Sequence, residues 1–314
     1  MLSAVSYLAL AVIAASIAVA WSRRFLASGA LVIANVIVFV MTDFGPHIQG
    51  IVDGRVVSQS VLRLELSLWA DNLYGAEPIA ALQLLTSMFV HADFMHLLGN
   101  LIVLLAFALP FEERVGHRTF LVLYLLSGLV GALAQVGTNW GDTMLMMGAS
   151  GAVFGVIGAF TAMYPRQVVV VPLPIGIMFF VRMKVITGAI VFAAMQFLLL
   201  FVSSQSNVAY MAHLGGLAGG LVLANAVVKI RGRPEEPKQR NAQVSFDDLR
   251  PYAVDAATRK ALAYMEESRD EPAIFQAWWE RFWKGARDPD TGQKVRPIGP
   301  GRVMREDGTV IDLG

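Results

Sequence analysis

Seven stretches of about twenty mostly apolar residues determine what this chain can fold into. A stretch of that length crosses the ~30 Å hydrocarbon core of a bilayer as one α-helix, and only helices and closed barrels satisfy their backbone groups in lipid. The stretches are residues 2–21, 25–43, 93–111, 118–137, 148–165, 185–203 and 209–229. Only 16% of the 314 residues are charged, whereas soluble domains average about 25%. The sequence therefore predicts an all-α, polytopic membrane helix bundle.

The first stretch is either a cleaved signal peptide or a retained helix. A signal peptide carries its basic residues before the apolar run, whereas Arg23 and Arg24 follow this one. We therefore expect residues 1–24 to form an additional N-terminal transmembrane helix.

Basic residues near the helix ends indicate orientation, because cytoplasmic connections carry an excess of Lys and Arg. Here they fall in alternate connections, at Arg23, Arg24, Arg114, Arg118, Arg166, Arg182, Lys184, Lys229, Arg231 and Arg233. The intervening connections, 44–92, 138–147 and 203–208, hold few basic residues, and we expect them on the outer side. The expected location is a bacterial inner membrane, with the C-terminal tail in the cytoplasm.

The composition changes at the C-terminal end of the last apolar stretch. Residues 231–243 form a charged, proline-bearing linker, and residues 244–314 form a small soluble tail that we expect to be mostly helical. Helices are predicted near 255–268 and 271–285. In the second, Phe275, Trp278, Trp279, Phe282 and Trp283 recur at spacings of three and four, which makes one aromatic face. This face predicts a small core or a helix packed on the membrane surface.

Polar side chains recur at one depth in three of the apolar stretches, where each is a candidate site residue because burying it in lipid costs free energy. His96 and Asn100 are four residues apart and share a helix face. Ser150 and His213 each lie within about four residues of the outer end of their helices. With a rise of ~1.5 Å per residue, these groups fall in one layer near the outer face.

Small residues allow the helices that carry these groups to approach closely. Gly151, Gly155 and Ala159 form one row, and Gly215–Gly219 and Gly216–Gly220 are two GxxxG steps. Such rows let helix backbones come together in lipid. We therefore expect Ser150 and His213 to reach hydrogen-bonding distance.

The residue types suit acyl transfer. Serine is a weak nucleophile that needs an adjacent base, and neutral histidine is such a base. The oxyanion of the intermediate needs donors, which His, Asn and the free amides of a helix start provide. Gly148 and Gly151 flank Ser150, and we expect them to let a substrate backbone approach.

These motifs resemble those of the rhomboid intramembrane serine proteases. The resemblance rests on "GASG" followed by "AVFG", on "AHLGG", and on "HADFMHLLGN", in that order; "FEERVG" and "ALVIANVIVF" also fit. It covers about residues 25–230 and implies a six-helix protease core there, so that residues 1–24 are an extra helix. It implies an endopeptidase that cuts single-span membrane proteins in or near the outer end of their transmembrane segments.

The resemblance also implies roles for individual residues. Ser150 would be the nucleophile and His213 the general base, without a third carboxylate. His96, Asn100 and the Ser150 amide would form the oxyanion hole, and the Phe154 ring would stack on the catalytic histidine. Structural roles are expected for the remaining candidates, His91, Glu112 and Arg114.

Other functions are less consistent with the sequence. A net charge of +1 and the absence of a basic cluster argue against nucleic acid as a partner. Zero cysteines exclude thiolate catalysis and cysteine-ligated metal, HExxH is absent, and we expect neither a metal nor a cofactor. A transporter would place charges at the midplane of the bilayer. A catalytically idle rhomboid-like protein that binds membrane clients remains the alternative, although both Ser150 and His213 are present.

Overall fold

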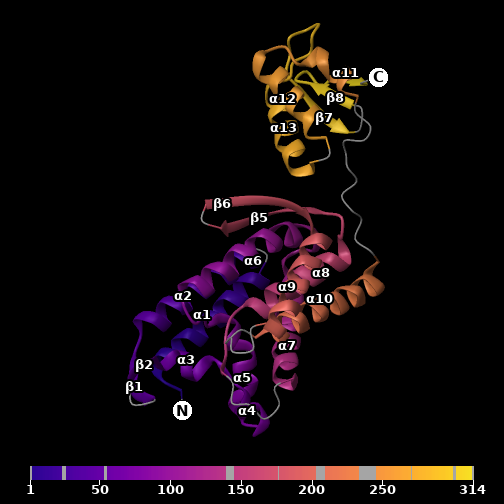
Figure 1. Cartoon of the computed structure of the whole chain (residues 1–314). Coiled ribbons are helices and arrows are strands. Elements are labelled where there is room, and N and C mark those ends of the chain that lie inside the picture. Colours follow the sequence, from indigo (N-terminus) through magenta and orange to yellow (C-terminus); the bar gives the residue numbers. More distant parts are fainter. Residues whose placement is uncertain are drawn as a thin grey trace. The chain divides into compact units, whose positions relative to one another are not determined.

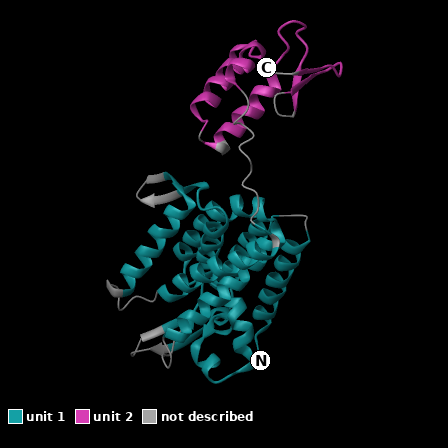
Figure 2. Ribbon diagram, turned by 90° about the vertical axis from the view of Figure 1, so that its right-hand side faces the viewer, with its two compact units in different colours: residues 1–234 teal, residues 235–314 magenta. Residues whose placement is uncertain are grey.

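The computed structural model describes most of the chain, which folds as two compact units, residues 1–234 and 235–314 (Figure 2). The described residues are 2–22, 26–52, 55–138, 145–175, 177–202, 209–232, 245–269, 271–299 and 302–312. Several predicted features lie outside these ranges: the basic pair Arg23–Arg24, the connection 203–208, all but the first two residues of the predicted linker, and most of the connection 138–147.

Unit 1 is built from the apolar helices that the sequence predicts (Figure 1). They are α1 (Ala4–Trp21), α2 (Ala27–Phe44), α6 (Phe94–Val115), α7 (His117–Thr138), α8 (Ser150–Met163), α9 (Val185–Val202) and α10 (Tyr210–Arg231). Within the described ranges, five of them are long and apolar enough to cross a membrane, namely α1, α2, α6, α7 and α10. The protein is therefore an integral, multi-pass membrane protein with a helix-bundle fold.

Helix α8 is the central helix of the bundle and is shorter than a membrane span. Every residue from Ala152 to Phe160 is buried, as expected for a helix that is apolar on all sides. Its 14 residues extend over ~21 Å at ~1.5 Å per residue, less than the ~30 Å hydrocarbon core. Because protein covers α8, the non-helical backbone at its ends can lie at membrane depth.

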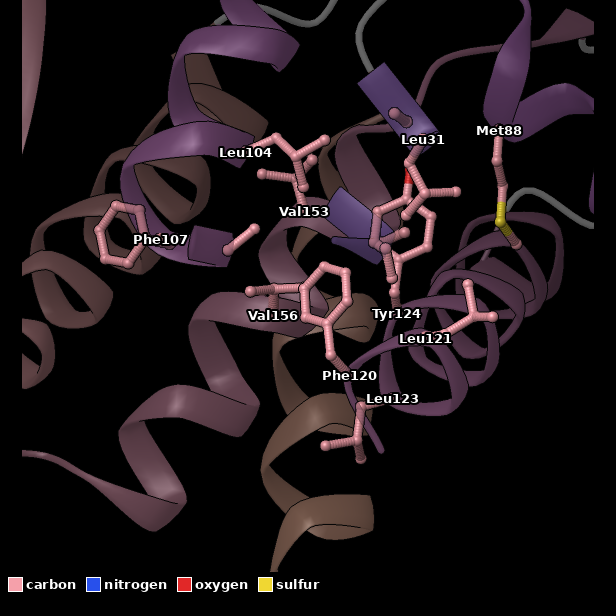
Figure 3. Packing of buried hydrophobic residues seen from close by; sticks show 14 of the residues in the cluster. Leu31, Met88, Leu104, Phe107, Phe120, Leu121, Leu123, Tyr124, Val153 and Val156 are labelled. Carbon is pink, nitrogen blue, oxygen red and sulfur yellow. The ribbon is translucent and has the colours of Figure 1, made fainter. Parts of the chain in front are cut away.

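The core of unit 1 joins the helices around α7 and α8. Phe120 and Tyr124 of α7 are fully buried and lie in one cluster with Leu31 of α2 and Val153 of α8 (Figure 3). Leu104 and Phe107 bring α6 into the same cluster. Burial of side chains of this size stabilises the bundle, mostly through close packing, since lipid is as apolar as the core.

The two glycine steps of α10 face different helices. A Cβ at Gly216 or Gly220 would overlap the carbonyl oxygens of Gly151 and Gly155 on α8. On the adjacent face, a Cβ at Gly219 would lie 2.9 Å from the Val130 side chain of α7. Glycine at these positions thus lets α10 fit against α7 and α8 at once, which the predicted close approach requires.

Short elements fill the connections of unit 1. The hairpin β1 (His47–Val52) and β2 (Arg55–Ser60) precedes α3 (Val61–Leu66), β3 (Leu68–Trp69), α4 (Ala70–Tyr74), α5 (Pro78–Thr86) and the 3₁₀ turn η1 (Ser87–Phe89). Strand β3 pairs antiparallel with β4 (Leu145–Met146) just before α8. The proline-bearing stretch 167–184 forms the antiparallel hairpin of β5 (Val168–Ile175) and β6 (Ile177–Lys184).

Unit 2 has its own core. It contains α11 (Phe246–Leu249), the 3₁₀ turn η2 (Arg250–Tyr252), α12 (Ala256–Glu267), α13 (Pro272–Gly285), and an antiparallel sheet in the order β7 (Val295–Gly299), β8 (Arg302–Arg305), β9 (Val310–Asp312). Phe275 and Phe282 are buried in this core, and the three predicted tryptophans pack against it. The aromatic face is therefore mainly a core face, and the sheet is an addition that the sequence analysis did not predict.

Candidate active site

Ser150 and His213 meet across two helices of unit 1. The Ser150 hydroxyl lies 2.7 Å from Nε2 of His213, within the range of a good hydrogen bond between an O–H donor and a nitrogen acceptor. Ser150 is the first residue of α8 and His213 is the fourth residue of α10. Residues 63 positions apart in the chain thus form a pair suited to proton transfer.

The start of α10 is held in place by α7. The side-chain oxygen of Gln135 accepts a hydrogen bond from the Ala212 amide at 3.1 Å. The same amide also donates to the carbonyl of Ala209, the N-cap residue of the helix, at 3.0 Å. Gln135 therefore fixes the backbone next to His213.

The loop before Ser150 is attached to the connection between α2 and α6 at three points. The Gly148 amide donates to the Ser87 carbonyl at 2.9 Å, the Ala149 amide donates to Nε2 of His91 at 3.4 Å, and β4 pairs with β3. Gly148 has a φ of 120°, which residues with a Cβ rarely adopt. These contacts set the position from which Ser150 starts its helix.

His91 is a neutral acceptor in this arrangement. It lies in the connection between η1 and α6 and is fully buried. Burial lowers its pKa to about 3, so the ring is uncharged near pH 7 and Nε2 is free to accept a hydrogen bond. His91 also contacts the His96 ring edge-on, with ring centroids 5.2 Å apart. A structural role for His91 stays a prediction.

His96 and Asn100 lie at the start of α6, beside the loop before Ser150. Asp93 caps this helix by accepting the His96 amide at 2.8 Å. A Cβ at Gly148 would lie 2.8 Å from Nε2 of His96 and 3.8 Å from the Ser150 hydroxyl, so the three residues surround one small space. Asn100 is buried, and its amide nitrogen donates to the His96 carbonyl at 2.8 Å.

Phe154 lies against the ring of His213. The two rings are 4.6 Å apart and inclined by only 4°. Phe154 is one turn after Ser150 on α8, so that the helix presents the hydroxyl and the ring to the same histidine. The stack fixes the plane of the imidazole and leaves its two nitrogens free for hydrogen bonds at the ring edge.

The sequence analysis missed Gln196. Its side-chain oxygen lies 2.7 Å from Nδ1 of His213, and the side chain is only 5% exposed. Gln196 is the one amide in the apolar stretch 185–202. The rule that a polar group in a membrane helix is a candidate site residue is the signal that would have found it.

The remaining candidates are Gly151, Glu112 and Arg114. Gly151 faces α10, where a Cβ at Gly216 would overlap its carbonyl oxygen, whereas a Cβ at Gly151 itself would lie 3.5 Å from the Ala212 carbonyl oxygen, an ordinary contact. Glu112 is buried on α6 and accepts the amides of Ala27 and Ser28 at the start of α2. The Arg114 guanidinium lies over the rings of Phe160 and Tyr164, 6.0 and 5.7 Å from their centroids.

Comparison with known proteins gives the same family. A family model described as "Rhomboid domain" matches residues 80–230. A Bacillus subtilis (strain 168) protein named "Putative rhomboid protease YdcA" is 32% identical over 172 residues, which cover 53% of this chain and 79% of that protein.

Two further relatives come from other organisms. "Rhomboid-like protease 3" of Toxoplasma gondii is 34% identical over 142 residues, 45% of this chain and 49% of the relative. "RHOMBOID-like protein 5" of Arabidopsis thaliana is 35% identical over 77 residues, 24% of this chain and 25% of the relative. This chain thus spans half or less of these two relatives but most of the bacterial one. Taken with the helix bundle and the order of its motifs, these matches show that the chain belongs to the rhomboid family.

Proposed function

We propose that this protein is an intramembrane serine endopeptidase that hydrolyses peptide bonds in membrane-protein substrates through a Ser150–His213 dyad. The 2.7 Å contact between the Ser150 hydroxyl and Nε2 of His213 carries the proposal. The names of its relatives, which include rhomboid proteases, support hydrolytic activity at the level of the family.

The chemistry follows from the two side chains. Ser150 Oγ attacks the scissile carbonyl carbon while its proton passes to Nε2 of His213. The C–N bond then breaks, and the proton goes from Nε2 to the leaving amine, which gives an acyl-serine. A water molecule, deprotonated by the same nitrogen, hydrolyses this ester and returns the proton to Ser150.

The oxyanion of each tetrahedral intermediate needs donors on the opposite side of the reacting carbon. We assign this role to the Ser150 amide, the His96 ring and the Asn100 amide group. Ala149, the N-cap residue of α8, has no side-chain oxygen with which to cap the helix. No side chain at the N-cap therefore competes for the first amides of the helix, among them that of Ser150, and the helix dipole favours an anion at this end.

The expected substrate is a single-span membrane protein cut near the outer end of its span. The orientation predicted from the basic residues puts the starts of α6, α8 and α10 on the outer side. Because α8 is shorter than a membrane span, Ser150 is expected below the membrane surface. A substrate helix must unwind to expose its carbonyl groups there, which Gly or Pro in the span makes easier by about 1 and 3 kcal/mol relative to Ala.

The first prediction tests the dyad in the full chain purified in detergent. Ser150→Ala and His213→Ala are each expected to abolish cleavage of a single-span model substrate, because the nucleophile or its base is lost. A fluorophosphonate probe, which reacts with activated serines, is expected to label the wild type and neither variant. Thermal melting of the variants controls for folding.

The results separate a protease from an idle client-binding protein. The proposal is supported if the wild type is labelled and cleaves the substrate, and if Ser150→Ala does neither. Binding of the model substrate without labelling or cleavage would instead favour the client-binding alternative. Cleavage that persists in folded Ser150→Ala would disprove the assigned nucleophile.

A further inference from the structure

Gln196 occupies the position next to His213 that a carboxylate holds in a Ser-His-Asp triad. Its Oε1 lies 2.7 Å from Nδ1 of His213, on the edge of the ring away from Ser150. Both side chains are at least nine-tenths buried, with exposures of 5% and 8%. We propose that Gln196 is a positioning residue that holds His213 in the tautomer able to accept the serine proton, an inference that rests on the proposed function.

The tautomer follows from the hydrogen-bond directions. A neutral imidazole carries one N–H and one acceptor nitrogen, and His213 can deprotonate Ser150 only if Nε2 is the acceptor. The proton must then be on Nδ1, where it donates to an oxygen. Gln196 presents its Oε1 to that nitrogen, so the amide stabilises the reactive tautomer and disfavours the other one.

A second effect applies once His213 has taken the proton. Both ring nitrogens then carry hydrogens, and Oε1 of Gln196 continues to accept from Nδ1. The amide dipole stabilises the developing imidazolium, as does the face of the Phe154 ring, whose negative quadrupole attracts a cation. Gln196 therefore acts on the transition state as well as on the ground state.

An amide is the appropriate third group at this depth. An ionised carboxylate buried without a partner costs several kcal/mol, whereas an amide with a hydrogen bond costs far less. The amide of the Cys-His-Asn proteases orients its histidine in the same chemical way. Glutamine thus supplies the orienting oxygen in a helix that is otherwise apolar.

The position of Gln196 is set by packing of its helix. Phe192 lies one turn earlier on α9 and contacts the Phe154 ring edge-on at 6.0 Å. It contacts Phe107 of α6 in the same way at 6.2 Å. These ring contacts hold the face of α9 that carries Gln196 against α8, where His213 is stacked.

The second prediction compares two substitutions at this position. Gln196→Met keeps the length of the side chain but removes the oxygen, and we expect kcat to fall about 10- to 100-fold with KM nearly unchanged. This loss equals roughly 1.4–2.7 kcal/mol at the usual conversion of 1.36 kcal/mol per tenfold. Gln196→Glu keeps an acceptor oxygen in either protonation state, so it is expected to retain most of the wild-type kcat. Gln196→Leu is measured as a second apolar variant in case the methionine does not fold.

The controls separate positioning from general damage to α9. Leu198→Met places the same new residue at an exposed position on the same helix and should leave kcat unchanged. The rate of fluorophosphonate labelling of Ser150 is measured in parallel and should fall with kcat. A purely structural role would lower the melting temperature of the apolar variants without slowing labelling, and that result would overturn the inference.

The outcomes that would refute the role of Gln196 differ from those that would refute the Ser150–His213 dyad. Wild-type kcat in folded Gln196→Met, with Ser150→Ala inactive, would refute only the role of Gln196. Loss of kcat in Gln196→Glu as severe as in Gln196→Met would also refute it, since an acceptor oxygen at this position would then fail to restore activity. Persistent cleavage by Ser150→Ala would refute the proposed function itself.

Discussion

At the scale of single residues, Gly148 links the loop before Ser150 to His96. A Cβ at this position would lie 2.8 Å from Cε1 and Nε2 of the His96 ring, closer than unstrained atoms approach. The backbone φ of 120° adds strain for any residue other than glycine. The geometry shows why glycine is required here, independently of whether a substrate backbone also approaches.

The third prediction is that Gly148→Ala displaces His96 or the loop and slows cleavage strongly. Loss of one oxyanion donor typically costs about 10²–10³ in rate, and we expect a loss in that range with modest change in substrate binding. Gly99→Ala on α6 is the control, because a Cβ there meets nothing within 4 Å. Steady-state cleavage assays and thermal melting measure both variants. Wild-type turnover in Gly148→Ala would show that the position of His96 does not matter for the reaction.

The sequence predicts which residues come together better than how they are oriented. Ser150, His213 and His96 are recognisable by type, depth and spacing, because helical rise converts position along the chain into depth. Gln196 was missed because contact with His213 also depends on how α9 is rotated about its axis. That rotation depends on ring packing by Phe192, which apolar periodicity alone does not specify.

At the scale of elements, Glu112 connects α6 to the start of α2. Its carboxylate accepts the amides of Ala27 and Ser28, two of the four donors that a helix start leaves unpaired. Leu26, at the N-cap position, supplies no side-chain hydrogen bond. Glu112 therefore provides from another helix the cap that α2 lacks in its own sequence.

The fourth prediction is that Glu112→Gln destabilises the protein but spares its chemistry. Replacing one carboxylate oxygen with an NH₂ group sets a donor against a donor, which costs about 1–3 kcal/mol for a buried group. We expect a lower melting temperature and nearly normal kcat in the folded fraction. Glu113→Gln is the matched control, because Glu113 is adjacent and exposed. Equal melting temperatures for the two variants would contradict the capping role.

Helices were easier to predict than strands, for physical reasons. A long apolar run specifies a membrane helix locally, and the observed helices, α8 included, begin and end within a few residues of the predicted ones. Strand pairing depends on partners far along the chain, as between β3 and β4, which contain two residues each. In β5 the residues Pro172 and Pro174 cannot donate to a strand partner, so the sequence pattern does not indicate the hairpin that β5 forms with β6.

At the scale of the whole molecule, the two units have separate cores. All candidate site residues, including Gln196, lie within unit 1. Unit 2 buries Phe275, Phe282 and Val303 in a cluster of its own, and Asp288, which is 2% exposed, pairs there with Arg305 at 3.0 Å. Among the described residues, each of these two cores is formed within one unit, which indicates that each unit is able to fold by itself.

The fifth prediction follows from this division. Truncation after Arg231 removes unit 2 but no residue assigned to the dyad, the oxyanion hole or the position of His213. We expect intrinsic cleavage of the model substrate in detergent to stay within a few-fold of the full chain, because the barrier depends on groups in unit 1. The truncated Ser150→Ala variant should be inactive and measures any contaminating protease. Fluorophosphonate labelling distinguishes a damaged site from poor substrate capture: loss of labelling in a truncated chain that still melts cooperatively would show that unit 2 supports the dyad. Normal labelling with lost cleavage would instead assign unit 2 to substrate binding, and either outcome would contradict the independence predicted here.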